Sequence, residues 1–151
     1  MTQAAGSPGI TIRDLQLEDY ETVLRLWMEA GLPFRPQGRD RRDKVAAELR
    51  RGTAVFLLAE ADGKLVGAVL GTHDGRKGWI NRLAVAPAFR RRGIARLLVA
   101  EVEVRMAALE LDITAALIES HNQASVRFFQ EIGYIHDPEI EYLSKRRSAE
   151  T

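Results

Sequence analysis

The segment from Trp79 to Ile118 constrains the fold of this chain most strongly. An apolar run, Trp79 to Val85, ends at Pro87, and an amphipathic pattern from about Gly93 to Leu109 leads into a second apolar run, Ile113 to Ile118. The two runs have the length of strands and the pattern between them has the length of a long helix. Strands joined by a helix in this way lie parallel, because the helix returns the chain to the same end of the sheet. We therefore expect a sheet that contains a parallel pair and a helical crossover, whose apolar face comprises Ile94, Leu97, Leu98, Val102, Met106 and Leu109.

The residues just before this segment predict an antiparallel meander. Ala54 to Ala61 and Leu65 to Gly71 are apolar runs joined by Asp62-Gly63, a pair that favours a tight hairpin turn. Asp74-Gly75 signals a second reversal before Trp79. Three antiparallel strands thus precede the crossover.

The remaining elements are predicted from shorter patterns. Ile10 to Arg13 alternates as a strand, and Glu18 to Ala30 reads as an amphipathic helix whose apolar stripe is Tyr20, Val23, Leu24, Trp27 and Met28. Leu32 to Arg42 reads as a loop, Asp43 to Arg51 as a weaker helix, and Asn122 to about Ile132 as a helix capped by Asn122. Short strands are expected at Tyr134-Ile135 and at Ile140 to Leu143.

Together these elements predict an α+β fold with a central, mostly antiparallel mixed sheet and helices on both faces. No linker, repeat or low-complexity segment divides the chain, so residues 1–151 are interpreted as a single domain. Its ordered core is expected at about 10–143, with loose termini at 1–9 and 146–151.

Charge and composition exclude several classes of function. The chain has 22 basic and 21 acidic residues, a net charge of +1, so no overall field favours nucleic acid or an anionic membrane. It has no cysteine, which rules out disulfides, thiolate zinc sites and a cysteine nucleophile. No histidine and carboxylate spacing suggests a metal site. With neither a signal peptide pattern nor a membrane-spanning run, a cytoplasmic protein is expected.

A cluster of arginines at the start of the long helix carries the chemistry. Arg90-Arg91-Arg92-Gly93 joins the Pro87 turn to the helix. A helix N-terminus offers free N–H groups and the positive end of the helix dipole, and glycine lets an anion approach the backbone. The arginines add charge suited to phosphate oxygens. Taken alone, the three arginines could equally be a solvated basic turn.

The wider pattern resembles the acetyl-CoA signature of the GNAT superfamily of N-acetyltransferases. The first signature is Val85-x-Pro87-x-x-Arg90-Arg91-Arg92-Gly93-Ile94-Ala95, after Leu83-Ala84-Val85. The second is Asn122-x-x-Ser125 followed by Phe128-Phe129 and Gly133-Tyr134. The resemblance covers about Ile10 to Leu143 and is that of a small stand-alone bacterial-type member. It implies a GNAT-like fold with a splay in the sheet, acetyl-CoA as co-substrate and acetyl transfer to a primary amine.

The resemblance also implies roles for individual residues. The backbone of Leu83, Ala84 and Val85 is expected to pair with the pantetheine arm of the cofactor. Backbone amides from Arg91 to Ala95 are expected to hold the pyrophosphate, with side chains nearby from Arg90, Arg92 and Arg96. Asn122, Ser125, Phe128 and Phe129 are expected to line the arm. Since helical neighbours point about 100° apart, one of the two phenylalanines is expected to belong to the core.

The catalytic pattern departs from the family at the general acid. Many relatives carry a tyrosine seven residues after the signature asparagine, and this chain has Phe129 there. Tyr134 is the first candidate replacement and Tyr142 the second. Without either, the thiolate of a thiol with a pKa near 8.5 can still leave, because acid assistance contributes about 10²–10⁴ in rate.

The general base is equally open. Asn81 and Arg82 stand where relatives carry a carboxylate on the strand before the signature. Glu119, after the Ile113 strand, and His73-Asp74 are the remaining candidates, while His121 and His136 read as loop histidines.

Direct attack in a ternary complex is the expected mechanism, because no cysteine can carry the acyl group. The acceptor is a small amine or a protein N-terminal α-amine, and the loop from Leu32 to Arg42 is expected to line its site. A non-catalytic module that binds CoA on the same fold is the alternative function. The sequence leaves a homodimer open and favours neither a membrane nor a nucleic-acid partner.

Overall fold

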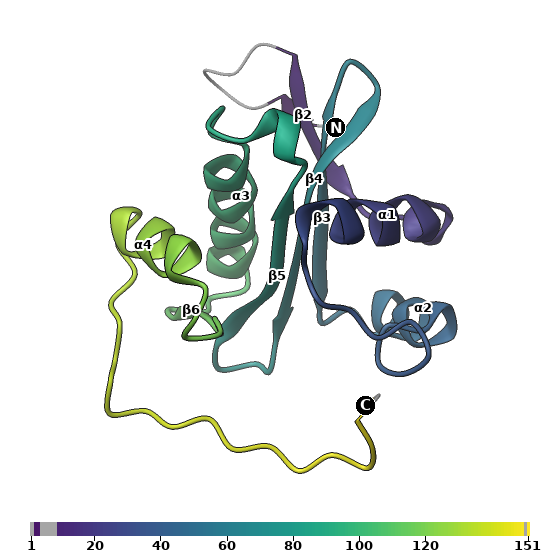
Figure 1. The fold of residues 1–151 in the computed structure, drawn as a ribbon. Helices are drawn as coiled ribbons and strands as arrows, with labels where there is room; N and C mark the ends of the chain where they lie inside the picture. The colour runs from purple at the N-terminus through teal and green to yellow at the C-terminus, as the bar shows by residue number, and fades with distance from the viewer. Residues whose placement is uncertain (1, 4–8, 150) are drawn as a thin grey trace.

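The computed structural model describes residues 2–3, 9–149 and 151. Its centre is a six-stranded sheet in the order β1-β2-β3-β4-β5-β6 (Figure 1). The strands are β1 (Thr2–Gln3), β2 (Ile10–Asp14), β3 (Ala54–Ala61), β4 (Lys64–His73), β5 (Gly78–Val85) and β6 (Thr114–Ala116). The helices are α1 (Tyr20–Ala30), α2 (Arg42–Arg50), α3 (Ile94–Ala108) and α4 (Gln123–Glu131), with 3₁₀ turns η1 (Leu17–Asp19) and η2 (Pro87–Phe89).

The predicted meander is confirmed. Strands β2 to β5 pair antiparallel in sequence order, and the β3–β4 hairpin closes at Asp62 and Gly63 with φ of 51° and 76°. Positive φ at both positions is the turn geometry that matches the twist of a two-residue hairpin. The Asp-Gly pair therefore sets the register of the β3–β4 hairpin, and β5, which begins the crossover, pairs on the other side of β4.

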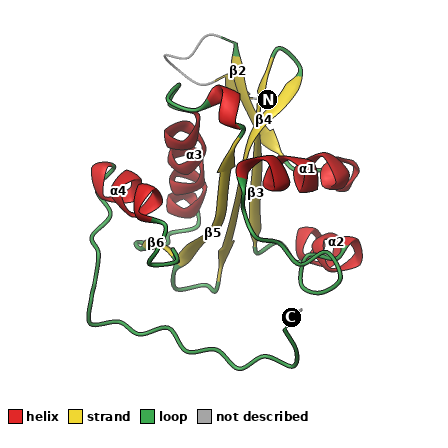
Figure 2. Cartoon of the chain, in the orientation of Figure 1, coloured by secondary structure: helices red, strands yellow, loops and turns green. Residues whose placement is uncertain are grey.

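The predicted crossover is also confirmed. β5 continues through η2 and α3 into β6, which pairs parallel with β5 (Figure 2). Three glycines on β4 and β5 let α3 lie close to the sheet. A Cβ at Gly78 would lie 2.8 Å from Met106, and one at Gly67 would lie 3.0 Å from Ile94.

The helices cover both faces, as expected. Helix α3 buries Ile94, Leu98, Val99, Val102 and Met106 in one apolar cluster on the sheet. Helix α1 buries Tyr20, Val23, Leu26 and Trp27 in a second cluster on the opposite face, where Val45 of α2 joins them.

Two positions of the predicted apolar stripes are wrong. Met28 is 67% exposed and Leu26 takes its place in the α1 stripe, because the helix begins at Tyr20 and turns Trp27 and Leu26 to the sheet. Leu109 is 49% exposed, because α3 ends at Ala108 and the chain turns there.

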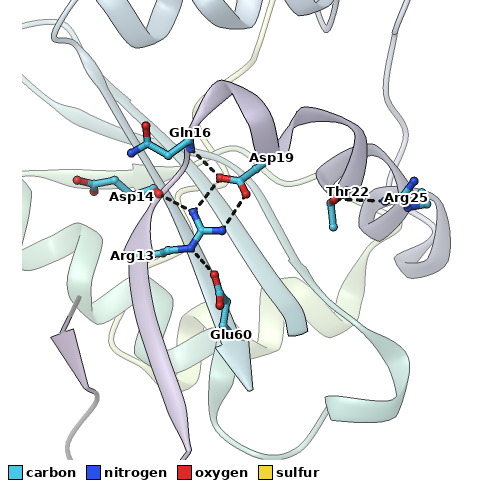
Figure 3. Close-up of polar contacts among 7 residues, drawn as sticks. All are labelled: Arg13, Asp14, Gln16, Asp19, Thr22, Arg25 and Glu60. Carbon is cyan, nitrogen blue, oxygen red and sulfur yellow. Dashed lines mark hydrogen bonds and ion pairs between the residues drawn. The ribbon is translucent and has the colours of Figure 1, made fainter. Parts of the chain in front are cut away.

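An ion-pair network fixes the entry to α1 (Figure 3). The guanidinium of Arg13 on β2 donates to both carboxylate oxygens of Asp19 at 2.8 Å and also binds Glu60 on β3. The Asp19 carboxylate additionally accepts from the backbone N–H of Gln16 at 2.8 Å. The hydrogen bond from Arg13 holds the pKa of Asp19 below its usual value.

The predicted chain ends are partly wrong. Neither Tyr134-Ile135 nor Ile140–Leu143 is a strand in the described residues, and Ile135 and Leu143 are 93% and 85% exposed. The segment runs extended past the sheet instead, where no neighbouring strand satisfies its backbone (Figure 1). At the other end, Thr2–Gln3 of the expected loose arm pairs with β2, while residues 1 and 4–8 lie outside the described residues.

The expected buried strand at Ile113 to Ile118 is shorter than predicted. Only Thr114–Ala116 pairs with β5, and these residues are half-buried because β6 forms the edge of the sheet. No helix within the described part of the chain is long and apolar enough to cross a membrane.

Candidate functional site

The carboxyl end of β5 is open on the side of β6. β6 pairs with Gly78, Trp79 and Ile80 and goes no further, so Leu83 to Val85 faces a gap in the sheet. This gap is the splay expected from the sequence. An unpaired stretch of strand can accept an extended ligand as if it were another strand.

A β-bulge lies just before this open stretch. Leu70 of β4 pairs with Arg82, whereas Gly71 pairs with Ile80, so Asn81 is the extra residue. The bulge shifts the alternation of side chains by one. Ile80 packs against the α3 cluster, and after the bulge it is Leu83 that packs on this face, while Arg82 points to α1.

The backbone groups of the open stretch point into the gap. The N–H of Ala86 donates to Val66 of β4 at 2.8 Å, so the N–H groups of Leu83 and Val85, which alternate with it, point the other way. These two N–H groups can hydrogen-bond an extended arm or polarise a carbonyl group placed beside them.

The arginine turn gives the start of α3 the shape of an anion site. Arg91 and Gly93 have φ of 64° and 77°, on either side of Arg92, and α3 begins at Ile94. Alternating left-handed backbone of this kind turns successive N–H groups to one side. Within the described residues, no backbone oxygen accepts from the N–H groups of Arg92, Gly93 or Ile94. A Cβ at Gly93 would meet no atom within 4 Å, so space is open above the turn.

The arginine side chains divide into two groups. The guanidinium of Arg90 lies 3.4 Å from the carbonyl of Val85 and 3.3 Å from that of Ala30, which ties the turn to β5 and α1. Arg92 stacks on the ring of Phe89 at 4.9 Å, while Arg91 and Arg96 are exposed. Ile94 contributes its backbone alone, because its side chain is 1% exposed in the core.

Helix α4 begins beside β6 as expected. The side chain of Asn122 accepts a hydrogen bond from the N–H of Ser125 at 3.2 Å and so caps the helix. Of the two phenylalanines, Phe129 is the buried one, and its ring packs edge-on against Phe128 at 5.1 Å and Tyr134 at 4.9 Å.

A buried ion pair marks the opposite face of β5. Arg82 lies 2.8 Å from the carboxylate of Asp40, both side chains are about 10% exposed, and the guanidinium stacks 4.7 Å from the ring of Trp27. The hydroxyl of Tyr20 donates to the carbonyl of Asp40 at 2.6 Å. The loop between α1 and α2 is therefore anchored directly against the bulge.

Comparisons with known proteins agree with this geometry. The family model described as "Acetyltransferase (GNAT) family" matches residues 12–134. A curated acetyltransferase from Pectobacterium atrosepticum is 32% identical over 123 residues, which are 82% of this chain and 86% of that protein. The chain belongs to the GNAT family of acetyltransferases. As a GNAT protein it is an N-acetyltransferase enzyme, an acyltransferase.

Solved GNAT structures share the fold. The PaiA N-acetyltransferase from Thermoplasma acidophilum, in complex with coenzyme A, is 22% identical with a TM-score of 0.76, over 85% of this chain and 91% of that one. The aminoglycoside N-acetyltransferase AAC(6')-Iy, in complex with a bisubstrate analogue of CoA, is 20% identical with a TM-score of 0.76, over 91% of this chain and 98% of that one. These likenesses establish the GNAT arrangement of the sheet and helices.

Tyr134 has a partner that the sequence did not indicate. Its hydroxyl donates to the carboxylate of Glu103 on α3 at 2.9 Å. Burial and this carboxylate raise the pKa of Tyr134 well above its usual value, so the hydroxyl keeps its proton at neutral pH. The hydroxyl of Tyr134 is thus a protonated group that is hydrogen-bonded to a carboxylate. Tyr142 is 67% exposed on the extended C-terminal segment.

The expected base candidates lie in different surroundings. Glu119 is exposed between β6 and α4 and pairs with exposed His121 at 3.4 Å. Asp74 accepts from the N–H groups of Lys77 and Arg76 at 2.8 Å, and these hydrogen bonds lower its pKa to about 2. Both ring nitrogens of His73 are buried and have no partner in the described residues. His73 pairs with Gly78 of β5, which lies three residues, about 10 Å along the strand, before the bulge at Asn81.

A different carboxylate lies on α2, on the α1 side of the sheet. Burial raises the pKa of Glu48 on α2. The charge of Asp40 also raises this pKa, while the charges of Arg51 and Arg82 lower it. The sequence reasoning missed Glu48, Asp40 and Glu103. A signal existed for one of them, because Arg82 stands inside a strand and a charged side chain there requires a partner.

Proposed function

We propose that the chain binds acetyl-CoA along the open end of β5 and transfers the acetyl group directly to a primary amine. The observation that carries this proposal is the adjacency of two features in a GNAT fold. The N–H groups of Leu83 and Val85 face a gap in the sheet, and a few residues later the turn at Arg91–Gly93 presents further N–H groups beneath open space. The pantetheine arm and the pyrophosphate belong to one CoA molecule, so a single cofactor would occupy both sites.

The arm and the phosphates would use mostly backbone groups. Leu83, Ala84 and Val85 would pair with the arm, and the amides of Arg91 to Ala95 would hold the pyrophosphate. Arg92 and Arg96 would supply charge from the side, with Arg90 holding the turn against Val85. Asn122, Ser125 and the less buried Phe128 would form the far wall, with Phe129 supporting it from the core, since α4 follows β6 on the other side of the gap.

The transfer step needs a neutral amine and a polarised thioester carbonyl. The amine nitrogen attacks the carbonyl carbon, the carbon–sulfur bond breaks, and the sulfur leaves as a thiolate with the electron pair of that bond. The N–H of Leu83 faces the gap and is placed to stabilise the developing negative oxygen. Glu48, whose raised pKa suits proton acceptance, is proposed to receive the proton of the amine, and Tyr134 or water to protonate the thiolate.

A small-molecule amine is favoured over a protein N-terminus as acceptor. The ion pair with Arg82 and the hydrogen bond from Tyr20 hold the loop between α1 and α2 at Asp40. A loop held in this way would leave less room for a large protein acceptor beside β5. The aminoglycoside N-acetyltransferases among the structural neighbours also act on small amines.

Two measurements test the proposal together. Acetyl-CoA at 100 times its dissociation constant is expected to stabilise the fold by about 2.7 kcal/mol, which raises the melting temperature by about 5–10 °C. Thiol release is then followed with a panel of small amines and with peptides that carry a free N-terminus. Absence of any thermal shift contradicts the CoA site. A shift without thiol release for any amine supports a non-catalytic CoA-binding module instead.

A further inference from the structure

Two guanidinium groups and one backbone N–H surround the carboxylate of Asp40. Arg82 lies 2.8 Å from it, Arg39 lies 4.0 Å from it, and the backbone N–H of Arg35 donates to it. Since Arg82 forms the close pair, the charge of Arg39 is compensated only at the longer distance. The Nε of Arg35 is buried and meets no acceptor in the described part of the chain.

The surroundings of Arg39 are rich in positive charge. Burial lowers the pKa of Arg39, and the nearby cations Arg82, Arg146 and Arg35 lower it further, with Asp40 as the opposing charge. Cations held together in a partly buried place are costly unless an anion joins them. The cluster therefore has the properties of an anion-binding site.

Arg39 also lines a cavity of about 420 Å³. This cavity lies between the α1–α2 loop, α2 and the C-terminal residues, and its charged side chains are Arg39, Arg41, Lys44, Arg51 and Glu48. A volume of this size admits a ligand of amino-acid size or larger. The residue next to Arg39 ties the cavity to the bulge, because the carboxylate of Asp40 pairs with Arg82, which follows Asn81.

We infer that the acceptor is an amine that also carries a carboxylate, and that Arg39 binds this carboxylate while the amine reaches the open end of β5. This inference rests on the proposed acetyltransferase function and adds the substrate class. Guanidinium groups bind carboxylates through paired, charge-assisted hydrogen bonds, which fixes the orientation of the acceptor. An amine with several positive charges and no carboxylate would meet like charges in the same cavity.

The test offers each amine in two forms, as a free acid and as its carboxamide. The kcat/KM values for thiol release from acetyl-CoA are expressed per neutral amine, so that the different pKa values of the two amines do not bias the ratio. A hydrogen bond to a charged group contributes about 1.5–3 kcal/mol, so the wild type is expected to prefer the acid by about 10- to 150-fold. Arg39→Gln is expected to remove most of this preference by slowing the acid alone, and Arg39→Lys to retain part of it.

Arg25→Gln is the matched control, since Arg25 is exposed on α1 and bonds only Thr22 among the contacts of its side chain in the described residues (Figure 3). This variant is expected to keep the wild-type ratio. Equal rates for acid and amide in the wild type would overturn the inference and leave the acetyltransferase intact. An Arg39→Gln variant that slows both forms equally would also overturn it, because the arginine would then only support the loop. Failure of every amine in both forms would instead contradict the proposed function.

Discussion

Replacing Gly93 by valine separates the stability of the turn from its proposed use in binding. Gly93 has φ of 77°, and a Cβ there would meet no protein atom within 4 Å. The change thus creates no clash within the protein, and its cost is the left-handed backbone conformation, about 1–2 kcal/mol for a residue with a Cβ. For a chain of this size that lowers the melting temperature by about 2–8 °C.

Acetyl-CoA binding is expected to suffer far more than stability. The new methyl groups would occupy the open space above the turn, where the phosphates would approach the N–H groups of Arg92 and Ile94. We expect Gly93→Val to weaken acetyl-CoA binding by more than about 100-fold, which corresponds to about 2.7 kcal/mol. Isothermal titration of acetyl-CoA measures the affinity, and differential scanning calorimetry measures the stability.

Gly52→Val provides the matched control. Gly52 has φ of 73°, and a Cβ there also meets no atom within 4 Å, but it lies between α2 and β3, away from the arginine turn. Both variants are expected to lose a similar amount of stability, and Gly52→Val to bind acetyl-CoA as the wild type does. Normal binding by Gly93→Val would refute the argument, and so would equal loss of binding in both variants.

Four further changes test the catalytic groups and the fold. Tyr134→Phe removes the hydroxyl bound to Glu103 and is expected to lower kcat by about 10²-fold with little change in acetyl-CoA affinity if Tyr134 protonates the thiolate, whereas an unchanged kcat would leave it a packing residue. Phe129→Tyr is expected to raise kcat modestly at a stability cost of about 1–3 kcal/mol, because the added hydroxyl enters a position that is 5% exposed; an unchanged kcat would separate this position from proton transfer. Glu48→Gln is expected to lower kcat/KM near neutral pH and to recover toward the wild-type value as the pH approaches the pKa of the acceptor amine, so a constant deficit across the pH profile would exclude a role as base. Asp19→Asn is expected to cost about 1.5–3 kcal/mol at pH 7; since the folded pKa of Asp19 is lowered, its contribution is present above the unfolded pKa near 3.9 and is lost as the pH falls through the folded value, so urea unfolding should show the difference between variant and wild type shrinking in acid.

The fold was largely predictable because its elements carry local signals. Asp62-Gly63 specifies a hairpin, and the stripe that begins at Ile94 specifies the crossover helix, so each could be placed without knowledge of its neighbours. The strand expected at Ile140 to Leu143 failed for the opposite reason. Its residues favour a strand, but a strand requires a neighbour to satisfy its backbone, and the pattern of one segment does not reveal whether a neighbour exists.

The candidate site was predictable where it depends on the backbone near a motif. The turn at Gly93 and the cap at Asn122 have the local geometry expected from their sequences. The cluster of Asp40, Glu48 and Arg82 was not, because these residues come from the α1–α2 loop, α2 and β5 and meet only in the folded chain. The bulge at Asn81 is visible in the spacing of the apolar residues of β5. Ile80 and Leu83 both pack on the α3 face although they are three residues apart, where regular alternation requires an even number.

That bulge separates the length of β5 from the faces that its side chains occupy. Ile80 and Arg82 pair with neighbouring residues of β4, and Asn81 is the extra residue between them. Deletion of Asn81 would therefore restore simple alternation in the existing register, with Ile80 and Leu83 still beneath α3 and Arg82 still facing α1. Regular pairing with Asn81 kept in the ladder would instead turn Arg82 into the apolar layer beneath α3 and withdraw Leu83 from that layer. Within this chain, the bulge itself, and not the side chain of Asn81, decides which side of the sheet each later residue of β5 faces.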